Sequence, residues 1–232
     1  MSGRDRGFNR MARWYRLVEF LAFGRDLERA RFMHLDRLAG CRDVLLMGEG
    51  DGRCAERLAR VAPRARIHCV DSSPGMIERA SRRIAGTSAA DRVSFTCADA
   101  LSFVPAPGAY DAAATLFFLD CFGEADAEGI ITRVGAALRP GATWLFGDFV
   151  LPSSGPARAR ARAWLFFLYT AFRWETGLSV SALPPSEEIL ARQGWRPVAS
   201  ADLQWGLLRS SVLTREPGNR TPSSTAARSA SA

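Results

Sequence analysis

The 232-residue chain carries a formal net charge of +7, and all 31 of its Lys or Arg positions are arginine. The lack of lysine excludes Schiff-base chemistry and a P-loop lysine. Apolar residues make up 47% and charged residues 24%, as in a single globular domain of this length. The positive charge reflects either arginine-rich genome composition or attraction for an anionic surface or substrate.

The cysteines and histidines indicate no metal site. The five cysteines form no CxxC pair, and the two histidines do not complete a zinc site at any familiar spacing. Reduced thiols favour a cytoplasmic protein. The longest apolar stretch, residues 164–172, is much shorter than the roughly 20 residues that a membrane-spanning helix needs.

The predicted elements alternate between helix and strand up to residue 149. Residues 1–12 are expected to form a mobile basic arm, and residues 13–39 one or two helices with apolar residues at helical spacing. Strands are predicted at 44–47, 67–70, 93–97, 112–118 and 143–149, and helices at 53–61, 74–84 and 125–138. This alternation predicts an α/β fold whose parallel sheet has right-handed crossovers.

The remaining chain follows another pattern. Residues 156–174 are arginine-rich and then aromatic, which predicts one long helix. A short helix at 185–193 precedes two strands, 195–201 and 207–213, which we expect to pair antiparallel. Residues 215–232 have almost nothing to bury and are expected to be a disordered tail. We therefore predict one domain, 13–214, in which 13–39 form a helical cap and 157–178 a helical insertion.

Three glycines at alternate positions follow the first predicted strand, and a helix begins directly after them. Gly48, Gly50 and Gly52 allow positive φ angles and close approach of a ligand to the backbone. The start of the following helix offers free N–H groups to a polar ligand. A tight β–α turn without any ligand is the alternative interpretation.

The second predicted strand ends in Asp71, about twenty residues beyond the glycine turn. A carboxylate at this place can accept hydrogen bonds from both hydroxyls of a ribose. The alternative is a helix cap ahead of Pro74. Together with the glycine turn, the ribose role is favoured.

These residues resemble the motifs of class I S-adenosylmethionine (SAM)-dependent methyltransferases, closely over residues 40–150 and loosely over 185–213. Residues 44–53 are similar to the family's first motif, 71–76 to its second, 98–100 to its third-strand motif, and 110–111 and 138–142 to those around its fourth and fifth strands. The resemblance implies a doubly wound, mostly parallel seven-stranded Rossmann-like sheet, SAM as the cofactor and a small-molecule acceptor.

The resemblance also implies which residues bind SAM. The glycines face its methionine part, Met76 packs near the adenine, and Asp99 with the N–H of Ala100 reaches the adenine ring. The implied cofactor-binding set is Gly48, Glu49, Gly50, Gly52, Asp71, Ser72, Met76, Asp99, Ala100, Thr115 and Leu116. The chain departs from the family at Leu46, where an acid usually helps to hold the SAM amino group. Glu49 is the nearby candidate to supply that charge; the alternative is weakened or lost SAM binding.

The acceptor is expected beyond the carboxyl end of the fourth strand, at residues 115–122. Asp120 lies where many small-molecule methyltransferases have a histidine, and it is the candidate catalytic residue. It could act as a general base, orient an acceptor amine or hydroxyl, or cap the following helix. Alignment of nucleophile, methyl and sulfur is the other main contribution that catalysis needs.

The segment 158–174 has three interpretations: a lid over an apolar or aromatic substrate, a peripheral membrane contact, and core packing against the N-terminal helices. Residues 172–178 resemble quinone-biosynthesis methyltransferases, which indicates a lipophilic acceptor. Two other functions use similar turns, namely a non-catalytic SAM-fold binding or assembly protein and an NAD-dependent oxidoreductase. Nucleic acid is not an expected partner, because no Asn/Asp-Pro-Pro-Tyr motif follows the fourth strand.

Overall fold

The computed structural model describes residues 25–152, 154–156, 158–160, 162–163 and 183–215. The predicted basic arm, the first half of the helical cap, most of the insertion at 157–178 and the tail after residue 215 lie outside these residues. None of the helices among the described residues is long and apolar enough to cross a membrane.

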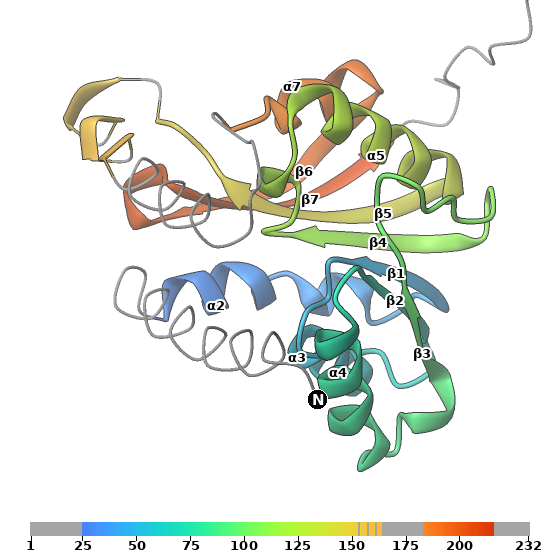
Figure 1. Cartoon of the computed structure of the whole chain (residues 1–232). Coiled ribbons are helices and arrows are strands. Elements are labelled where there is room, and N and C mark those ends of the chain that lie inside the picture. The colour runs from blue at the N-terminus through green and yellow to red at the C-terminus, as the bar shows by residue number, and fades with distance from the viewer. Residues whose placement is uncertain (1–24, 153, 157, 161, 164–182, 216–232) are drawn as a thin grey trace, which may run out of the picture.

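A seven-stranded sheet forms the centre of the protein, in the order β3-β2-β1-β4-β5-β7-β6 (Figure 1). The strands are β1 (Asp43–Met47), β2 (Arg66–Asp71), β3 (Val93–Cys97), β4 (Tyr110–Leu116), β5 (Leu138–Phe149), β6 (Trp195–Leu203) and β7 (Leu208–Arg215). The first five are parallel, and β7 runs antiparallel to both β5 and β6. The predicted fold class and the antiparallel C-terminal pair are therefore confirmed.

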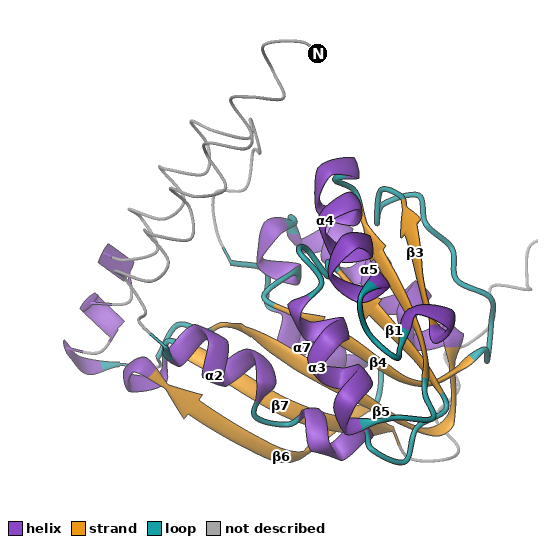
Figure 2. Ribbon diagram, turned by 90° about the horizontal axis from the view of Figure 1, so that it is seen from below, coloured by secondary structure: helices purple, strands orange, loops and turns teal. Residues whose placement is uncertain are grey.

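Helices cover both faces of the sheet, and for this reason the central strands are apolar on both sides. One face carries α2 (Asp26–Phe32), α3 (Arg53–Val61) and α4 (Pro74–Ala85), and the other carries α5 (Glu124–Ala137) and α7 (Ser186–Arg192). Figure 2 shows α2 lying along β7 and β6. There Leu27 and Ala30 pack against Leu207 and Leu208.

Side-chain carboxylates link the N-terminal ends of the parallel strands. Asp111 accepts hydrogen bonds from the backbone N–H groups of Arg42 and Asp43, at 2.9 and 2.7 Å. The Asp43 carboxylate in turn pairs with Arg66 and Arg139. The N-terminal ends of β1, β2, β4 and β5 are thus held together. The C-terminal ends of the strands are left for ligands.

Two predicted boundaries differ from the structure for backbone reasons. The strand predicted at 112–118 ends at Leu116, because Phe117 has a φ of 56° that an extended strand cannot contain. The turn expected at 138–142 belongs to β5 instead, since Leu138 already pairs with Tyr110. The residues between this pair and the next are accommodated by a bulge with Gly141 at φ 78°.

Thr115, which the family resemblance places at the cofactor, has its side chain in the core. Its hydroxyl accepts a hydrogen bond of 2.9 Å from Nε1 of the buried Trp144, whose ring meets that of Trp195 edge-on. We therefore expect Thr115→Val to destabilise the protein by about 1–3 kcal/mol, because the indole N–H loses its acceptor. Urea unfolding measures this loss. Affinity for S-adenosylhomocysteine (SAH) should be unchanged, and a weaker affinity would return Thr115 to the cofactor site.

Candidate functional site

The three glycines of the turn between β1 and α3 are required for different reasons. All three have positive φ, at 68°, 68° and 86°. A Cβ on Gly52 would lie 2.7 Å from Cα of Ala80, so this glycine lets α3 approach α4 closely. A Cβ on Gly48 would meet the ring of Phe118, whereas one on Gly50 would point into open space. The open side at Gly50 is where a ligand can approach the backbone.

The Asp71 carboxylate at the end of β2 joins two turns. Its Oδ2 accepts a hydrogen bond from the N–H of Gly50, and its Oδ1 accepts one from the N–H of Ser73, both at 2.9 Å. Ser73, and not Asp71, is the N-cap of α4, because its hydroxyl accepts from the N–H of Met76. Each carboxylate oxygen keeps a further lone pair that can accept from a ribose hydroxyl.

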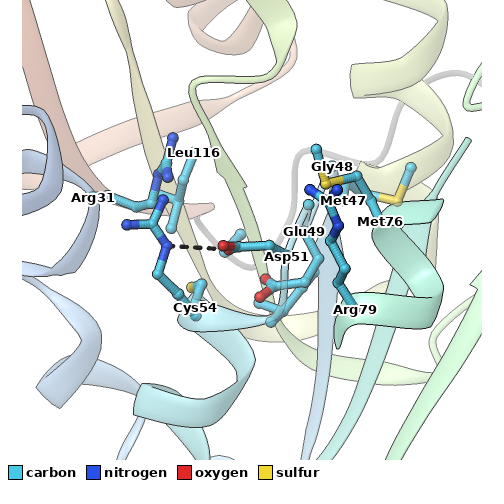
Figure 3. Close-up of a pocket in the computed structure, with 13 residues that line it drawn as sticks. Arg31, Met47, Gly48, Glu49, Asp51, Cys54, Met76, Arg79 and Leu116 are labelled. Atoms are coloured by element: carbon cyan, nitrogen blue, oxygen red, sulfur yellow. Dashed lines mark hydrogen bonds and ion pairs between the residues drawn. The ribbon is translucent and has the colours of Figure 1, made fainter. Parts of the chain in front are cut away.

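A pocket opens beside this turn at the carboxyl ends of β1 and β4, where the strand order reverses (Figure 3). Five of the predicted cofactor residues line it: Gly48, Glu49, Gly50, Met76 and Leu116. Its other lining residues are Arg31, Leu46, Met47, Asp51, Arg53, Cys54, Arg79 and Ala114. The pocket therefore has the position that ligands take in doubly wound α/β sheets.

The remaining predicted cofactor residues lie outside this lining. Gly52 and Asp71 hold the turn in shape, as described above. Ser72 is exposed at the start of α4. Asp99, also exposed, accepts a hydrogen bond from the N–H of Leu101, and the carbonyl of Ala100 accepts one from Arg133. Their proposed contacts to adenine remain predictions.

Glu49 lines the pocket, but its carboxyl group is turned to the start of α3. Oε1 accepts a hydrogen bond of 2.9 Å from the N–H of Ala55, and the N–H of Cys54 also donates to this side chain. Burial raises the pKa of Glu49 to about 8, so the group is largely neutral at pH 7. The expectation that Glu49 replaces the acid missing at Leu46 therefore has no support in this geometry.

The pocket and the turn beside it fit an adenosyl ligand: the pocket has an open glycine and the Met76 side chain, and Asp71 behind the turn has a fixed carboxylate with free lone pairs. Residues 44–141 also match the sequence profile described as a methyltransferase domain. Residues 44–141 therefore form a methyltransferase domain with the fold of the class I SAM-dependent enzymes. No curated protein matches this sequence.

Solved structures with the same fold include two methyltransferases and a cyclase. The mitomycin 7-O-methyltransferase MmcR has a TM-score of 0.63 and 21% identity, over 83% of this chain and 54% of its own. The N-methyltransferase NodS from Bradyrhizobium japonicum WM9 has a TM-score of 0.56 and 22% identity, and the match covers 83% of this chain and 98% of NodS. The [4+2]-cyclase SpnF has a TM-score of 0.58 and 18% identity, and the match covers 79% of this chain and 82% of SpnF. This chain thus spans about half the length of MmcR and nearly the full length of NodS.

Two buried aspartates meet beyond the end of β4 and near the end of β5. Asp120 lies in the 3-10 turn Leu119–Cys121, and Asp148 lies near the end of β5. Their carboxyl groups hydrogen-bond each other, which requires that the pair hold a proton. Burial raises the pKa of Asp120 to about 6, and burial together with the charge of Asp120 raises that of Asp148 well above its usual value. The pair therefore retains a proton more strongly than two exposed carboxyl groups would.

The alternative role of Asp120 as a helix cap is wrong. The N-cap of α5 is Gly123, and no side chain caps that helix end. Asp120 is also absent from the pocket lining, so its place at the acceptor remains a prediction. Sequence reasoning missed Asp148, although an acid that ends an apolar strand was the same signal that singled out Asp71. It also missed Arg31, which the sequence does not distinguish from the other arginines.

Because α3 and α4 lie close together at Gly52, we expect alanine substitutions at Gly50 and Gly52 to reduce the stability of the protein by different amounts. Gly50→Ala should destabilise the protein by about 1–2 kcal/mol, the cost of a left-handed alanine. Gly52→Ala carries that cost and also forces its Cβ against the Ala80 backbone, so we expect about 2–5 kcal/mol. Equal losses in urea unfolding would contradict the packing role of Gly52.

The aspartate pair predicts a dependence of stability on pH. Because the folded-state pKa values are raised, the pair favours the folded state at low pH, and this contribution is lost as the pH rises through them. The melting temperature of Asp148→Asn minus that of the wild type should therefore increase between pH 5 and pH 9. Asp202→Asn is the control, because Arg209 lowers the pKa of Asp202 and this carboxyl stays ionised over that range. A pH-independent difference for Asp148→Asn would show that the two carboxyls do not share a proton.

Proposed function

We propose that this protein transfers a methyl group from SAM to a small, lipophilic or aromatic acceptor. The observation that carries the proposal is the pocket at the β1–β4 switch point, with its open glycine turn fixed by Asp71. The match of residues 44–141 to a methyltransferase domain supports the donor. MmcR and NodS, which share the fold, support a small molecule as the acceptor.

The chain's own residues would perform binding and alignment. When bound, SAM supplies a methyl group on a positively charged sulfur, which is already an activated donor. The glycine turn faces its methionine part and Asp71 binds its ribose, and together they fix the direction of the methyl group. Rings of Phe118 and Phe122, in contact beside the turn, offer an apolar surface for the acceptor and exclude water. Alignment of this kind accounts for a large share of rate enhancement in two-substrate reactions.

Asp120 is the proposed partner of the acceptor's N–H or O–H group. We assign the shared proton to Asp148, which leaves the Asp120 carboxylate as the hydrogen-bond acceptor. It can orient the nucleophile, and it can take the proton that the nucleophile loses when its bond to the methyl carbon forms and the carbon–sulfur bond breaks. Arg31, whose charge lowers the pKa of Asp120, helps to keep this carboxylate ionised.

A second candidate is a SAM-fold protein that binds the cofactor without transferring its methyl group. Two observations favour it. Leu46 occupies the position of the usual acid, and the cyclase SpnF shows that the fold also carries other chemistry. Incubation with SAM and a panel of phenols, quinols and amines separates the two, because only the first candidate yields SAH together with a methylated product.

Calorimetric titration with SAM, SAH and NAD tests the cofactor. We expect SAM and SAH to bind and NAD not to bind. Asp71→Ala should weaken SAH binding by about 1.5–3 kcal/mol, because the ribose loses a charged hydrogen-bond acceptor. Asp91→Ala, an exposed aspartate in the 3-10 turn Ala90–Arg92, is the matched control. Binding of NAD alone would overturn the proposed function, and an unchanged SAH affinity would remove Asp71 from the site.

A further inference from the structure

We propose that the end of the protein formed by the tip of the β6–β7 hairpin and residues 154–163 docks on an anionic lipid surface. Trp205 is the aromatic anchor of this surface, and Arg160 and Arg162 bind the lipid phosphates. The inference goes beyond methyl transfer, because it concerns where the protein binds and not what its pocket holds. For the described part of 158–174, it selects one of the three interpretations that the sequence allows.

The tip of the β6–β7 hairpin presents a tryptophan to solvent. Trp205 lies in the 3-10 turn Gln204–Gly206 and is 75% exposed. A single exposed apolar side chain is common on protein surfaces and indicates nothing by itself. The argument therefore depends on what holds Trp205 in place and on which groups surround it.

The backbone holds Trp205 in an unfavourable conformation. Gln204 and Trp205 have φ angles of 53° and 62°, in the left-handed region that favours glycine and asparagine. Neighbouring segments fix this tip, since the N–H of Val150 donates to the carbonyl of Leu207 at 2.8 Å and the Gln204 amide donates to Asp26. A tryptophan that costs backbone energy and gains little burial indicates a use for its indole at the surface.

Arginines accompany the exposed indole. The guanidinium of Arg160 lies 5.6 Å from the centre of the Trp205 ring and donates to Oε1 of Gln204 at 2.9 Å. Arg160 and Arg162 are both exposed, and arginine is the only ionisable residue type within 154–163. The hairpin tip thus offers an aromatic ring and positive charge to the same partner.

The acidic groups bonded to the hairpin leave this positive charge uncompensated. Asp202, in β6, pairs with Arg209 at 2.7 Å, and Asp26 accepts its hydrogen bond from the hairpin tip. Among the described residues, neither carboxylate pairs with Arg160 or Arg162. The whole chain also carries a net charge of +7. A surface of anionic lipids has the complementary charge.

A lipid surface fits this arrangement better than single-stranded nucleic acid, the other anionic partner that combines with arginine and tryptophan. Nucleic acid binding of that kind stacks successive bases on several aromatic side chains. Trp205 is the one exposed aromatic residue in the part of the chain that the structure describes. Tryptophan also favours the boundary between water and lipid, where arginines can bind phosphates.

The hairpin tip lies at the same ends of the strands as the pocket. Leu208, the first residue of β7, pairs with Phe149 at the end of β5 and with Leu203 at the end of β6. Figure 1 shows the tip, residues 154–163 and α2 at one end of the molecule. The Phe149 ring meets that of Phe117, which directly follows β4. A docked lipid surface would lie on the side where a lipophilic acceptor is expected, a consequence that rests on the proposed function.

Sedimentation of the full chain with lipid vesicles tests the charge. We expect binding to vesicles of phosphatidylcholine and phosphatidylglycerol, about tenfold weaker binding to phosphatidylcholine alone, and weaker binding at high salt. Arg160→Gln combined with Arg162→Gln should weaken binding to the anionic vesicles about tenfold or more, since each arginine near such a surface contributes about a fivefold factor.

The matched control combines Arg37→Gln with Arg64→Gln. It removes the same charge from two exposed arginines in the turns that precede β1 and β2, at the other ends of the strands. This control should bind anionic vesicles as the wild type does. Equal weakening in the two double variants would show that binding follows total charge, and it would overturn the proposal.

Two substitutions of Trp205 test the anchor. Trp205→Asn should weaken vesicle binding severalfold without lowering the melting temperature, because asparagine tolerates the left-handed backbone. Trp205→Phe should keep most of the binding but lose the blue shift of tryptophan fluorescence that the wild type shows on anionic vesicles. An unchanged blue shift in Trp205→Phe, or wild-type binding to a single-stranded oligonucleotide and not to vesicles, would refute the docking surface. The assay contains neither SAM nor acceptor, so its failure is distinct from failure of the proposed function.

Discussion

The two hydrogen bonds of the Asp71 carboxylate fix the turns that surround the pocket at the C-terminal ends of the strands. One oxygen holds Gly50 in the turn after β1, and the other holds Ser73 at the start of α4. The β1–β2 pairing, the packing of Gly52 on Ala80 and a hydrogen bond from Arg83 to the Asp51 carbonyl also join these segments. A charged acceptor for two N–H groups is a strong constraint, because each unpaired N–H in a partly buried turn costs as much as a lost hydrogen bond. The pocket is thus shaped before any ligand arrives, which lowers the cost of binding.

The charged residues at the N-terminal ends of the strands differ in their partners from those at the C-terminal ends. Where the strands begin, Asp43 and Asp111 are bound to arginines and to backbone N–H groups, and they serve the fold. Where the strands end, Asp120 and Asp148 meet in the interior with no arginine bonded to either among the described residues. Such a pair is costly to ionise. An arrangement that reduces stability is retained most often where it has a chemical use.

Much of the fold followed from hydrophobic periodicity. Strands buried on both faces read as continuous apolar runs, and β1, β2 and β3 were predicted within one residue at each end. The errors came from backbone detail: the positive φ of Phe117 and the bulge at Gly141 depend on neighbouring strands. In the site, the glycines and Asp71 carry a local pattern, whereas Arg31 and the meeting of Asp120 with Asp148 depend on contacts between distant segments. The contact of Glu49 with the start of α3 could not be predicted either. An acidic residue at such a turn can bind either free backbone N–H groups or a ligand.

The packing of α2 has a consequence for the order in which the pocket is completed during synthesis. Leu27 and Ala30, from the N-terminal part of the described chain, are buried against Leu207 and Leu208, which are among the last residues of the sheet to be translated. A nascent chain can assemble the glycine turn as soon as β1, β2 and α4 have left the ribosome, since local units fold first. The surface that buries Leu27 and Ala30 of this helix is incomplete until β7 has also emerged. The glycine turn can therefore form before the helix that carries Arg31 is fully packed.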